Sequence, residues 1–213
     1  MELAHESRQR AWWQESSLDP ALETLIGMEG AAKSISEFEP LLIPGLLQTP
    51  EYARAVVNAY RGGDAGANRA AFAARMRRQD ILQDGPSPRL SVVLDEAALR
   101  RRVGGTAVMR EQLQHLADSV EQHGVLLQVI PFAAGVHVGT LNGFIILEFD
   151  QPIPSIPAAA VPGVVYVETL AGGTYYDQPG EVERHLKAFT ELSRSAITPE
   201  KSLDYLRALR LEI

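Results

Sequence analysis

The sequence predicts an α/β (α+β) protein in which a mixed sheet of about four to five strands is flanked by helices. Short apolar runs rich in valine, isoleucine and leucine recur along the chain, and longer segments with helical spacing separate them. Strands interleaved with helices favour a sheet whose faces are covered by helices. With 213 residues, 46% hydrophobic and 22% charged, the chain is large enough to bury a substantial core.

The N-terminal segment is predicted to be helical. Residues 2–15 form a first helix whose Trp12 and Trp13 are expected to anchor it by packing. Residues 22–35 form a second, because apolar side chains recur there at intervals of three and four. Gly27 and Gly30 weaken this second prediction, since glycine disfavours a helix interior.

The run from residue 37 to residue 55 combines a strand, a turn and a helix start. Phe38 and the apolar residues through Ile43 are predicted to form a buried strand, which the Pro44-Gly45 pair ends. Thr49, followed by Pro50 and an early glutamate, is typical of a helix N-terminus. The hydroxyl accepts a hydrogen bond from a free amide, and the N–H that proline lacks would have no partner within the first turn. This helix is predicted to reach about residue 60.

The remaining elements follow from the same periodicities and breakers. Helices are expected over 67–83 and 106–122, the latter ended by Gly124, and strands over 90–94, 125–132, 144–149 and 164–168. The 90–94 strand ends in a turn at Asp95-Glu96. Residues 150–163 contain four prolines and are predicted to be a lid, a binding loop or a disordered tip. Helices over 179–196 and 199–210 close the chain, and Thr198-Pro199-Glu200 opens the second of them in the same manner as the helix start at Thr49.

These elements are expected to form one compact unit with three parts. Residues 1–36 are an N-terminal helical segment, 37–178 an α/β ligand-binding core, and 179–213 two C-terminal helices packed on that core.

Composition excludes several function classes. A net charge of −7 opposes nucleic-acid binding by this chain itself, because affinity for phosphates depends on clustered lysine and arginine. The arginines at 75, 77 and 78 and at 100–102 are interpreted as solvated helix surface. With no cysteine, disulfides and thiolate sites are excluded, and no run is apolar and long enough for a signal peptide or a membrane span, so a cytoplasmic protein is expected.

No standard catalytic or cofactor motif is present. Phosphate loops, dinucleotide fingerprints and serine nucleophile elbows are all missing, and the Gly-Gly pairs at 62–63, 104–105 and 172–173 are interpreted as turns. None of the five histidines has a partner at metal-ligand spacing. We therefore expect neither a metal nor a cofactor.

Three carboxylates lie at the ends of predicted strands: Glu39, Glu96 and Glu168. A partly buried carboxyl with a raised pKa can act as a general acid or base, although each of the three could instead cap an amide or pair with an arginine. His137 lies in a glycine-flanked loop after a strand, where sites are common, although a structural or solvent-facing role is the alternative. The predicted catalytic residues are Glu168 or Glu96 as base and His137 or Tyr175 as acid.

Aromatic, apolar and a few polar side chains around the same motifs are typical of a small-molecule pocket. The residues predicted to bind substrate are Glu39, Gln48, Tyr52, Arg54, Phe132 and Tyr166.

Several segments resemble, in order and spacing, one known domain. They include Ile26-Gly27-Met28-Glu29, the run from 37 to 55, the arginine-rich segment 75–79, and the segments 94–99, 128–132 and 165–168. Together they resemble the C-terminal, antitoxin-like domain of actinobacterial XRE-family transcriptional regulators. The resemblance implies effector sensing, partner binding and assembly, while a helix-turn-helix reads DNA. That module has no room before Trp12, so a stand-alone domain is expected.

The leading functional hypothesis is a cofactor-independent acid/base enzyme that performs an elimination, conjugate addition or cyclisation on a natural-product-like substrate. The alternative is a domain that senses an effector and dimerises, or that binds a small toxin partner. Self-association as a homodimer is compatible with each hypothesis.

Overall fold

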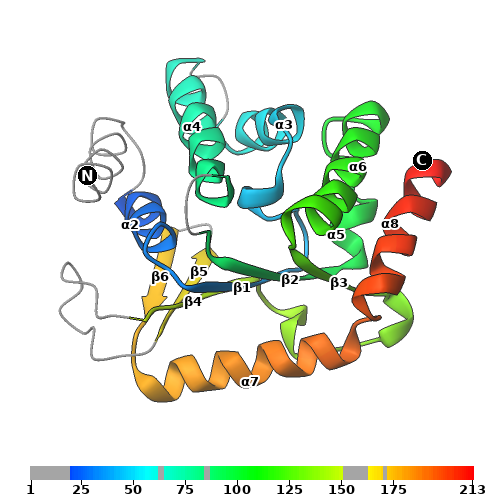
Figure 1. The fold of residues 1–213 in the computed structure, drawn as a ribbon. Helices are drawn as coiled ribbons and strands as arrows, with labels where there is room; N and C mark the ends of the chain where they lie inside the picture. The colour runs from blue at the N-terminus through cyan, green and yellow to red at the C-terminus, as the bar shows by residue number, and fades with distance from the viewer. Residues whose placement is uncertain (1–19, 62–64, 84–86, 151–162, 170–171) are drawn as a thin grey trace.

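A computed structural model describes residues 20–61, 65–83, 87–150, 163–169 and 172–213 (Figure 1). It confirms the predicted fold class: a mixed sheet with helices on both faces. The sheet has six strands, one more than the upper end of the predicted range. The strands are β1 (Ser34–Glu39), β2 (Arg89–Asp95), β3 (Leu126–Ile130), β4 (Phe144–Glu148), β5 (Gly163–Thr169) and β6 (Gly172–Tyr176). The helices are α2 (Pro20–Glu29), α3 (Pro50–Arg61), α4 (Ala65–Arg78), α5 (Glu96–Arg100), α6 (Thr106–His123), α7 (Pro179–Ser195) and α8 (Pro199–Glu212), with 3-10 turns at Gly45–Leu47, Gln79–Leu82, Phe132–Ala134 and Val138–Thr140.

The strand order is β3-β2-β1-β4-β5-β6. Strands β1, β2 and β3 are parallel to one another, whereas β4 runs antiparallel to both β1 and β5, and β6 runs antiparallel to β5. Because β4 is antiparallel to both of its neighbours, β5 points in the same direction as β1. The carboxyl ends of β1, β2 and β5 therefore lie at one edge of the sheet.

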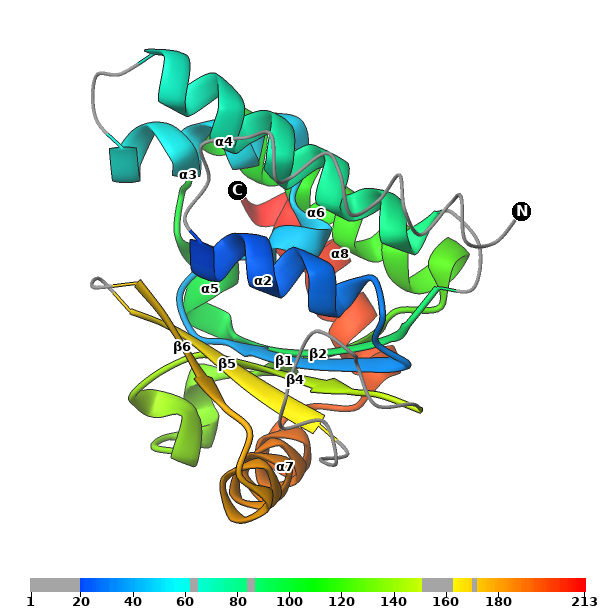
Figure 2. The ribbon, with the colours of Figure 1, turned by 90° about the vertical axis from the view of Figure 1, so that its left-hand side faces the viewer.

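The two faces of the sheet have separate apolar cores. Ile35 of β1 belongs to the larger core, beneath α2, α3, α6 and α8, which cover the upper face in Figures 1 and 2. Phe38 belongs to the smaller core on the opposite face, where α7 contributes Val182 and Leu192. Side chains alternate between faces along a strand, so Glu37 and Glu39 point with Ile35 toward the upper face.

The structure corrects the strand that was predicted from Phe38 through Ile43. The chain forms β1 earlier, over Ser34–Glu39, and Ile35 belongs to this strand instead of to the preceding helix, which ends at Glu29. Pro40 follows β1 directly and has no N–H for further ladder pairing. Beyond it, Leu41 is 53% exposed while Ile43 is buried, which fits an irregular turn.

Strand β6 was not predicted, because Gly172 and Gly173 were interpreted as a turn. They begin an edge strand instead, and Gly173 has a packing reason to be glycine. A Cβ at position 173 would lie 2.2 Å from Cε2 of Tyr166, so the ring of the neighbouring strand occupies the space a side chain needs.

Several predicted element ends are confirmed. The Thr49 hydroxyl accepts a hydrogen bond from the Tyr52 amide at 3.3 Å, and the Thr198 hydroxyl caps α8. Gly124 ends α6 in the left-handed conformation. The predicted helix over 2–15 with its tryptophans, and the proline-rich loop apart from its ends, lie outside the described residues.

The larger core joins all three predicted parts of the chain. It includes Leu25 near the start, the strands of the sheet, and Leu206 and Leu209 of α8. The boundary predicted after residue 36 falls inside β1, so the N-terminal part and the sheet share this strand. Within the described ranges, no helix is long and apolar enough to cross a membrane.

Candidate active site

Two acidic residues of β1 face the helices that cover the sheet. Glu37 is 1% exposed and lies between Val92 of β2 and Ile145 of β4 in the strand register. Glu39, two residues on, is partly exposed at the end of the strand. Glu168, near the end of β5, is exposed at the same edge of the sheet and interacts electrostatically with both. The three form what we call the carboxyl cluster: Glu37, Glu39 and Glu168.

A buried ion pair lies above this cluster. Arg78 at the end of α4 is 6% exposed and Glu29 at the end of α2 is fully buried. The guanidinium donates two hydrogen bonds to the Glu29 carboxylate, from Nε to Oε2 and from Nη2 to Oε1, each 2.5 Å long. This two-point geometry commits the charge of Arg78 to Glu29. It also joins α2 to α4 over the sheet (Figure 2).

Arg75, also on α4, has no charged partner in a two-point contact like that of Arg78 among the described residues. Arg75 lies one helical turn before Arg78, on the same side of the helix, and is partly exposed. Its Nη1 donates to the Oε1 of Gln48 at 3.0 Å. Because this acceptor is a neutral amide, the charge of Arg75 is left to act on Glu39 and Glu168.

The segment between β1 and α3 is held rigidly beside the cluster. Gln48 donates to the Ile43 carbonyl at 2.7 Å, and Gln79 donates to the carbonyls of Gly45 and Gln48 at 2.9 and 2.8 Å. The Tyr52 hydroxyl accepts the Ile43 amide at 3.1 Å. These bonds satisfy the backbone of a non-strand segment and fix the position of Gln48, which in turn holds Arg75.

The environment favours the protonated form of both β1 carboxyls. Burial raises the pKa of Glu37 to about 8; Arg78 opposes this change, while the negative charges of Glu29 and Glu168 add to it. Burial, together with the charges of Glu37 and Glu168, also raises the pKa of Glu39 well above its ordinary value. Burial lowers the pKa of Arg75, and the nearby charge of Arg78 adds to that effect. Near neutral pH, β1 therefore presents carboxyls able to hold and release protons.

Glu37 has an unsatisfied oxygen. Its Oε2 is inaccessible to solvent and has no hydrogen-bond partner among the residues that the structure describes. A buried polar atom without a partner is costly, so natural proteins rarely keep one without a reason. The atom is a candidate contact for a ligand or a transferred proton.

Several of the predicted site residues lie on this side of the sheet. They include Glu39, Gln48, Tyr52, Tyr166, Tyr175 and Glu168. The roles differ among them: Glu39 and Glu168 belong to the carboxyl cluster and Gln48 positions Arg75. Tyr52 and Tyr166 are buried packing residues. Burial raises the pKa of Tyr52 to about 12, so its hydroxyl stays protonated.

Tyr175, predicted as a catalytic acid, has a structural contact. Its hydroxyl donates to the backbone carbonyl of Ala21, and its ring lies 5.1 Å from that of Tyr166. The side chain thereby ties β6 to α2.

Glu96, a predicted base, is part of a different set of contacts. It begins α5, where it accepts the Phe132 amide at 2.8 Å and pairs with Arg100 at 2.5 Å. Although burial acts to raise the pKa of Glu96, the hydrogen bond from Phe132 and the pairing with Arg100 lower it. This carboxylate joins α5 to the segment after β3, which agrees with the alternative prediction that Glu96 caps an amide or pairs with an arginine.

His137, a predicted acid, also lies apart from the carboxyl cluster. Its Nε2 is 3.1 Å from Oδ2 of Asp95, and its ring packs edge-on against Phe38, which belongs to the core beneath the sheet. Asp95 in turn accepts the Ala97 amide at the start of α5. This pair fixes the loop after β3 to the end of β2.

Two residues predicted to bind substrate are placed outside the site. Arg54 is exposed on α3, with its guanidinium 4.7 Å from the centre of the Phe72 ring. Phe132 is 57% exposed, and its backbone amide donates to another predicted residue, Glu96. Both residues sit near motifs in the sequence, but these contacts are with Phe72 and Glu96 and not with the β1 carboxyls.

Sequence reasoning missed Glu29, Glu37, Arg75 and Arg78. The interpretation of Arg78 as solvated surface was wrong, because α4 packs this side toward Glu29. The pattern around Glu37 gave no clear signal, because each face of β1 mixes one apolar residue with two polar ones. For the arginines, the spacing of three residues on a helix was the only clue, and it is shared by many exposed helices.

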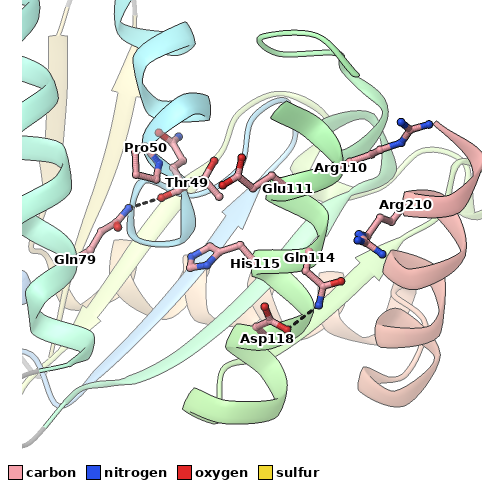
Figure 3. Close-up of a pocket in the computed structure, with 10 residues that line it drawn as sticks. Thr49, Pro50, Gln79, Arg110, Glu111, Gln114, His115, Asp118 and Arg210 are labelled. Atoms are coloured by element: carbon pink, nitrogen blue, oxygen red, sulfur yellow. Dashed lines mark hydrogen bonds between the residues drawn. The ribbon is translucent and has the colours of Figure 1, made fainter. Parts of the chain in front are cut away.

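A polar surface hollow of about 560 Å³ lies beside the same segment (Figure 3). Thr49 and Pro50 border it on one side, and α6 borders it on the other with side chains that include Glu111, His115 and Asp118. Gln48 and Gln79 also line it, so the hollow adjoins the residues that brace Arg75. Burial lowers the pKa of His115 in its wall, so this imidazole favours the neutral form.

Comparison with known proteins gives a family and no function. A family described as "Domain of unknown function (DUF5753)" matches residues 22–208. The chain belongs to this family. No curated protein and no solved structure matches it. The matched range of the DUF5753 domain runs from most of α2 to most of α8 and includes the carboxyl cluster and the buried ion pair.

Proposed function

We propose that this DUF5753 domain is a small-molecule-binding protein that acts as a cofactor-independent acid/base enzyme. The observation that carries the proposal is the pairing of Glu37 and Glu39 on one face of β1, both with raised pKa values, beside a guanidinium without an ionic partner among the described residues. The reaction class is an elimination, conjugate addition or cyclisation on a natural-product-like substrate, in the cytoplasm.

In this mechanism Glu37 and Glu39 share one proton, so that one carboxyl acts as the base and the other as the acid. Neighbouring carboxyls in a site of low polarity titrate as a pair, so one is ionised while the other still holds its proton. The ionised member removes a carbon-bound proton from the substrate and the protonated member returns a proton to the product. Arg75, held by Gln48, stabilises negative charge that develops on a substrate oxygen.

A generic probe tests the base without knowledge of the substrate. The ring of 5-nitrobenzisoxazole opens when a base removes its carbon-bound proton: the N–O bond breaks and a coloured nitrophenolate forms. We expect the wild-type protein to accelerate this reaction, with a rate that rises with pH through about 8 as Glu37 ionises. Glu37→Gln and Glu39→Gln should each reduce the rate at least tenfold.

The matched control is Glu183→Gln, which removes an exposed carboxylate of α7 that pairs with Lys187 at the surface. This variant should retain the wild-type rate. A wild-type rate no faster than that of an equal concentration of free acetate, or equal rates in all variants, would exclude the acid/base role.

A second candidate function rests on exposed apolar side chains. Val136 and Leu141, in the loop after β3, are 92% and 88% exposed, and Phe132, Val138 and Leu41 are each more than half exposed. Such exposure is typical of an interaction surface. It supports the alternative of a domain that senses an effector, dimerises or binds a toxin partner.

Mass measurement in solution distinguishes this candidate. A regulator-type domain should form a stable homodimer, or a heteromer when co-expressed with a small partner protein, and Val136→Ser with Leu141→Ser should dissolve it. A monomer at all concentrations, with no complex on co-expression, favours the enzyme.

A further inference from the structure

We propose that the ligand of the carboxyl cluster is an organic cation that carries a primary or secondary ammonium group. The inference deepens the proposed function and rests on it for the location of the site. It is drawn from an imbalance of charge around β1 and from the unpartnered oxygen of Glu37.

Two of the four arginines of α4, Arg75 and Arg78, act on the carboxyls of β1. Arg78 is committed to Glu29 by two hydrogen bonds. Arg75 bonds the neutral amide of Gln48. Among the described residues, three carboxyls therefore share one uncommitted guanidinium, which leaves room for further positive charge.

The carboxyls of β1 hold protons before a ligand binds. Two carboxyls that lack cationic partners avoid mutual repulsion by keeping protons. A ligand that brings its own positive charge replaces those protons, whereas an anionic ligand adds to the repulsion. The cluster therefore discriminates in favour of cations.

Oε2 of Glu37 is buried and has no hydrogen-bond partner in the described part of the chain. Once Glu37 gives up its proton to make way for a bound cation, its carboxylate needs a hydrogen-bond donor. An ammonium group supplies two or three N–H donors on one atom, enough to bond Glu37 and a neighbouring carboxylate together. The described acidic and histidine side chains include no group of three arranged to hold a metal ion, so the geometry suits a molecular cation better than a metal.

The charged groups around the cluster come from several elements. They are Glu29 of α2, Arg75 and Arg78 of α4, and Glu168 of β5. Arg101 acts electrostatically on Tyr52 of α3, which also interacts with Glu39. Burial also raises the pKa of Glu29, although the charge of Arg78 opposes this change. Proton release upon binding is therefore assigned with the Glu37→Gln and Glu39→Gln variants, which remove the β1 carboxyls one at a time.

Benzylamine, benzyl alcohol and benzoate test the inference, because they share a ring and differ in charge. Binding to the full chain is measured at pH 7 by isothermal titration and by ligand-observed NMR. We expect benzylamine to bind at least tenfold more tightly than benzyl alcohol and benzoate not to bind. Titrations in two buffers of different ionisation enthalpy should reveal release of protons with benzylamine alone.

Variants locate the binding. Glu37→Gln and Glu39→Gln should each weaken benzylamine at least tenfold and abolish proton release, while Glu183→Gln should change neither. Far-UV circular dichroism checks that the variants are folded, and a fully folded Glu37→Gln protein that binds benzylamine like the wild type overturns the inference. So do the absence of benzylamine binding and a preference for benzoate.

The failures of the two proposals are distinguishable. If 5-nitrobenzisoxazole is opened in a Glu37-dependent way but benzylamine does not bind, the ligand class is wrong and the acid/base role stands. If benzylamine binds through Glu37 and Glu39 but no base catalysis occurs, the site binds cations without catalysis.

Discussion

At the scale of single residues, the unusual feature is a glutamate in the middle of a buried strand. The partners of Glu37 on the neighbouring strands are Val92 and Ile145, and ionised glutamate is almost never fully buried unless it is paired. The ion pair between Glu29 and Arg78 lies nearby, but its two charges are committed to each other. Such a residue destabilises the fold. Buried groups with strongly shifted pKa values cluster at functional sites, so Glu37 is a candidate functional residue.

The raised pKa of Glu37 predicts a specific dependence of stability on pH. Below the unfolded-state pKa of about 4.5, the carboxyl is neutral whether the chain is folded or not. As pH rises from there to about 8, the unfolded chain loses the proton while the folded chain keeps it, so stability falls by up to about 1.4 kcal/mol per pH unit. Glu37→Gln should match the wild type near pH 5 and exceed it at pH 8.

Urea denaturation of the wild type and Glu37→Gln at several pH values measures this difference. Glu183→Gln serves as the control and should follow the wild-type profile. Parallel profiles for wild type and Glu37→Gln would contradict a raised pKa at Glu37.

The buried pair of Glu29 and Arg78 predicts a strongly asymmetric response to mutation. Glu29→Gln leaves the guanidinium buried without a counterion and should reduce the free energy of unfolding by about 3–5 kcal/mol. Replacing both partners, as Glu29→Gln with Arg78→Met, should recover part of the loss, since no unpaired charge remains. Thermal and urea denaturation check both variants, and a double variant no more stable than the single one would show that the pair is needed as such.

At the scale of elements, β1 and β6 explain most of the difference between prediction and structure. An alternating strand with two serines and two glutamates has little hydrophobic signal, while the apolar run that follows it is broken by Pro40 and Pro44. In β6, glycines that are typical of a turn serve a neighbour instead: Gly173 makes room for the ring of Tyr166. Neither strand can be recognised from the residues of its own segment alone.

The close approach at Gly173 is directly testable. Gly173→Ala should destabilise the protein by about 1–3 kcal/mol, because the new methyl group collides with the Tyr166 ring or displaces it. Gly180→Ala in α7 is the matched control, since a Cβ there meets no atom within 4 Å and alanine favours the helix. Equal melting temperatures for the two variants would contradict the packing at β6.

At the scale of the whole molecule, one core joins segments from both halves of the chain. Leu206 and Leu209 of α8 are buried in the same cluster as Leu25 of α2 and the parallel strands. The Ser202 hydroxyl also accepts the Val129 amide of β3 at 3.0 Å. The C-terminal helices are therefore part of the fold and not an appendage.

Removal of residues 199–213 should accordingly prevent stable folding. The deletion exposes the core face that α8 covers and leaves the edge of β3 without its hydrogen-bond partner. Far-UV circular dichroism and limited proteolysis of the shortened chain measure the effect, with Leu211→Ser in the full chain as the control, because Leu211 is 81% exposed. Cooperative unfolding of the shortened chain near the wild-type temperature would contradict this role of α8.

The sequence by itself determined the fold class, most helices, the caps at Thr49 and Thr198 and the stop at Gly124, because these depend on periodicity and on the chemistry of a few adjacent residues. It also drew attention to Glu39 and Glu168. Only the tertiary structure decided that these two share an edge of the sheet with Glu37, while Glu96 and His137 are tied into other contacts. The physical reason is that burial and electrostatic neighbours depend on strand order and helix packing, which bring together residues more than a hundred positions apart.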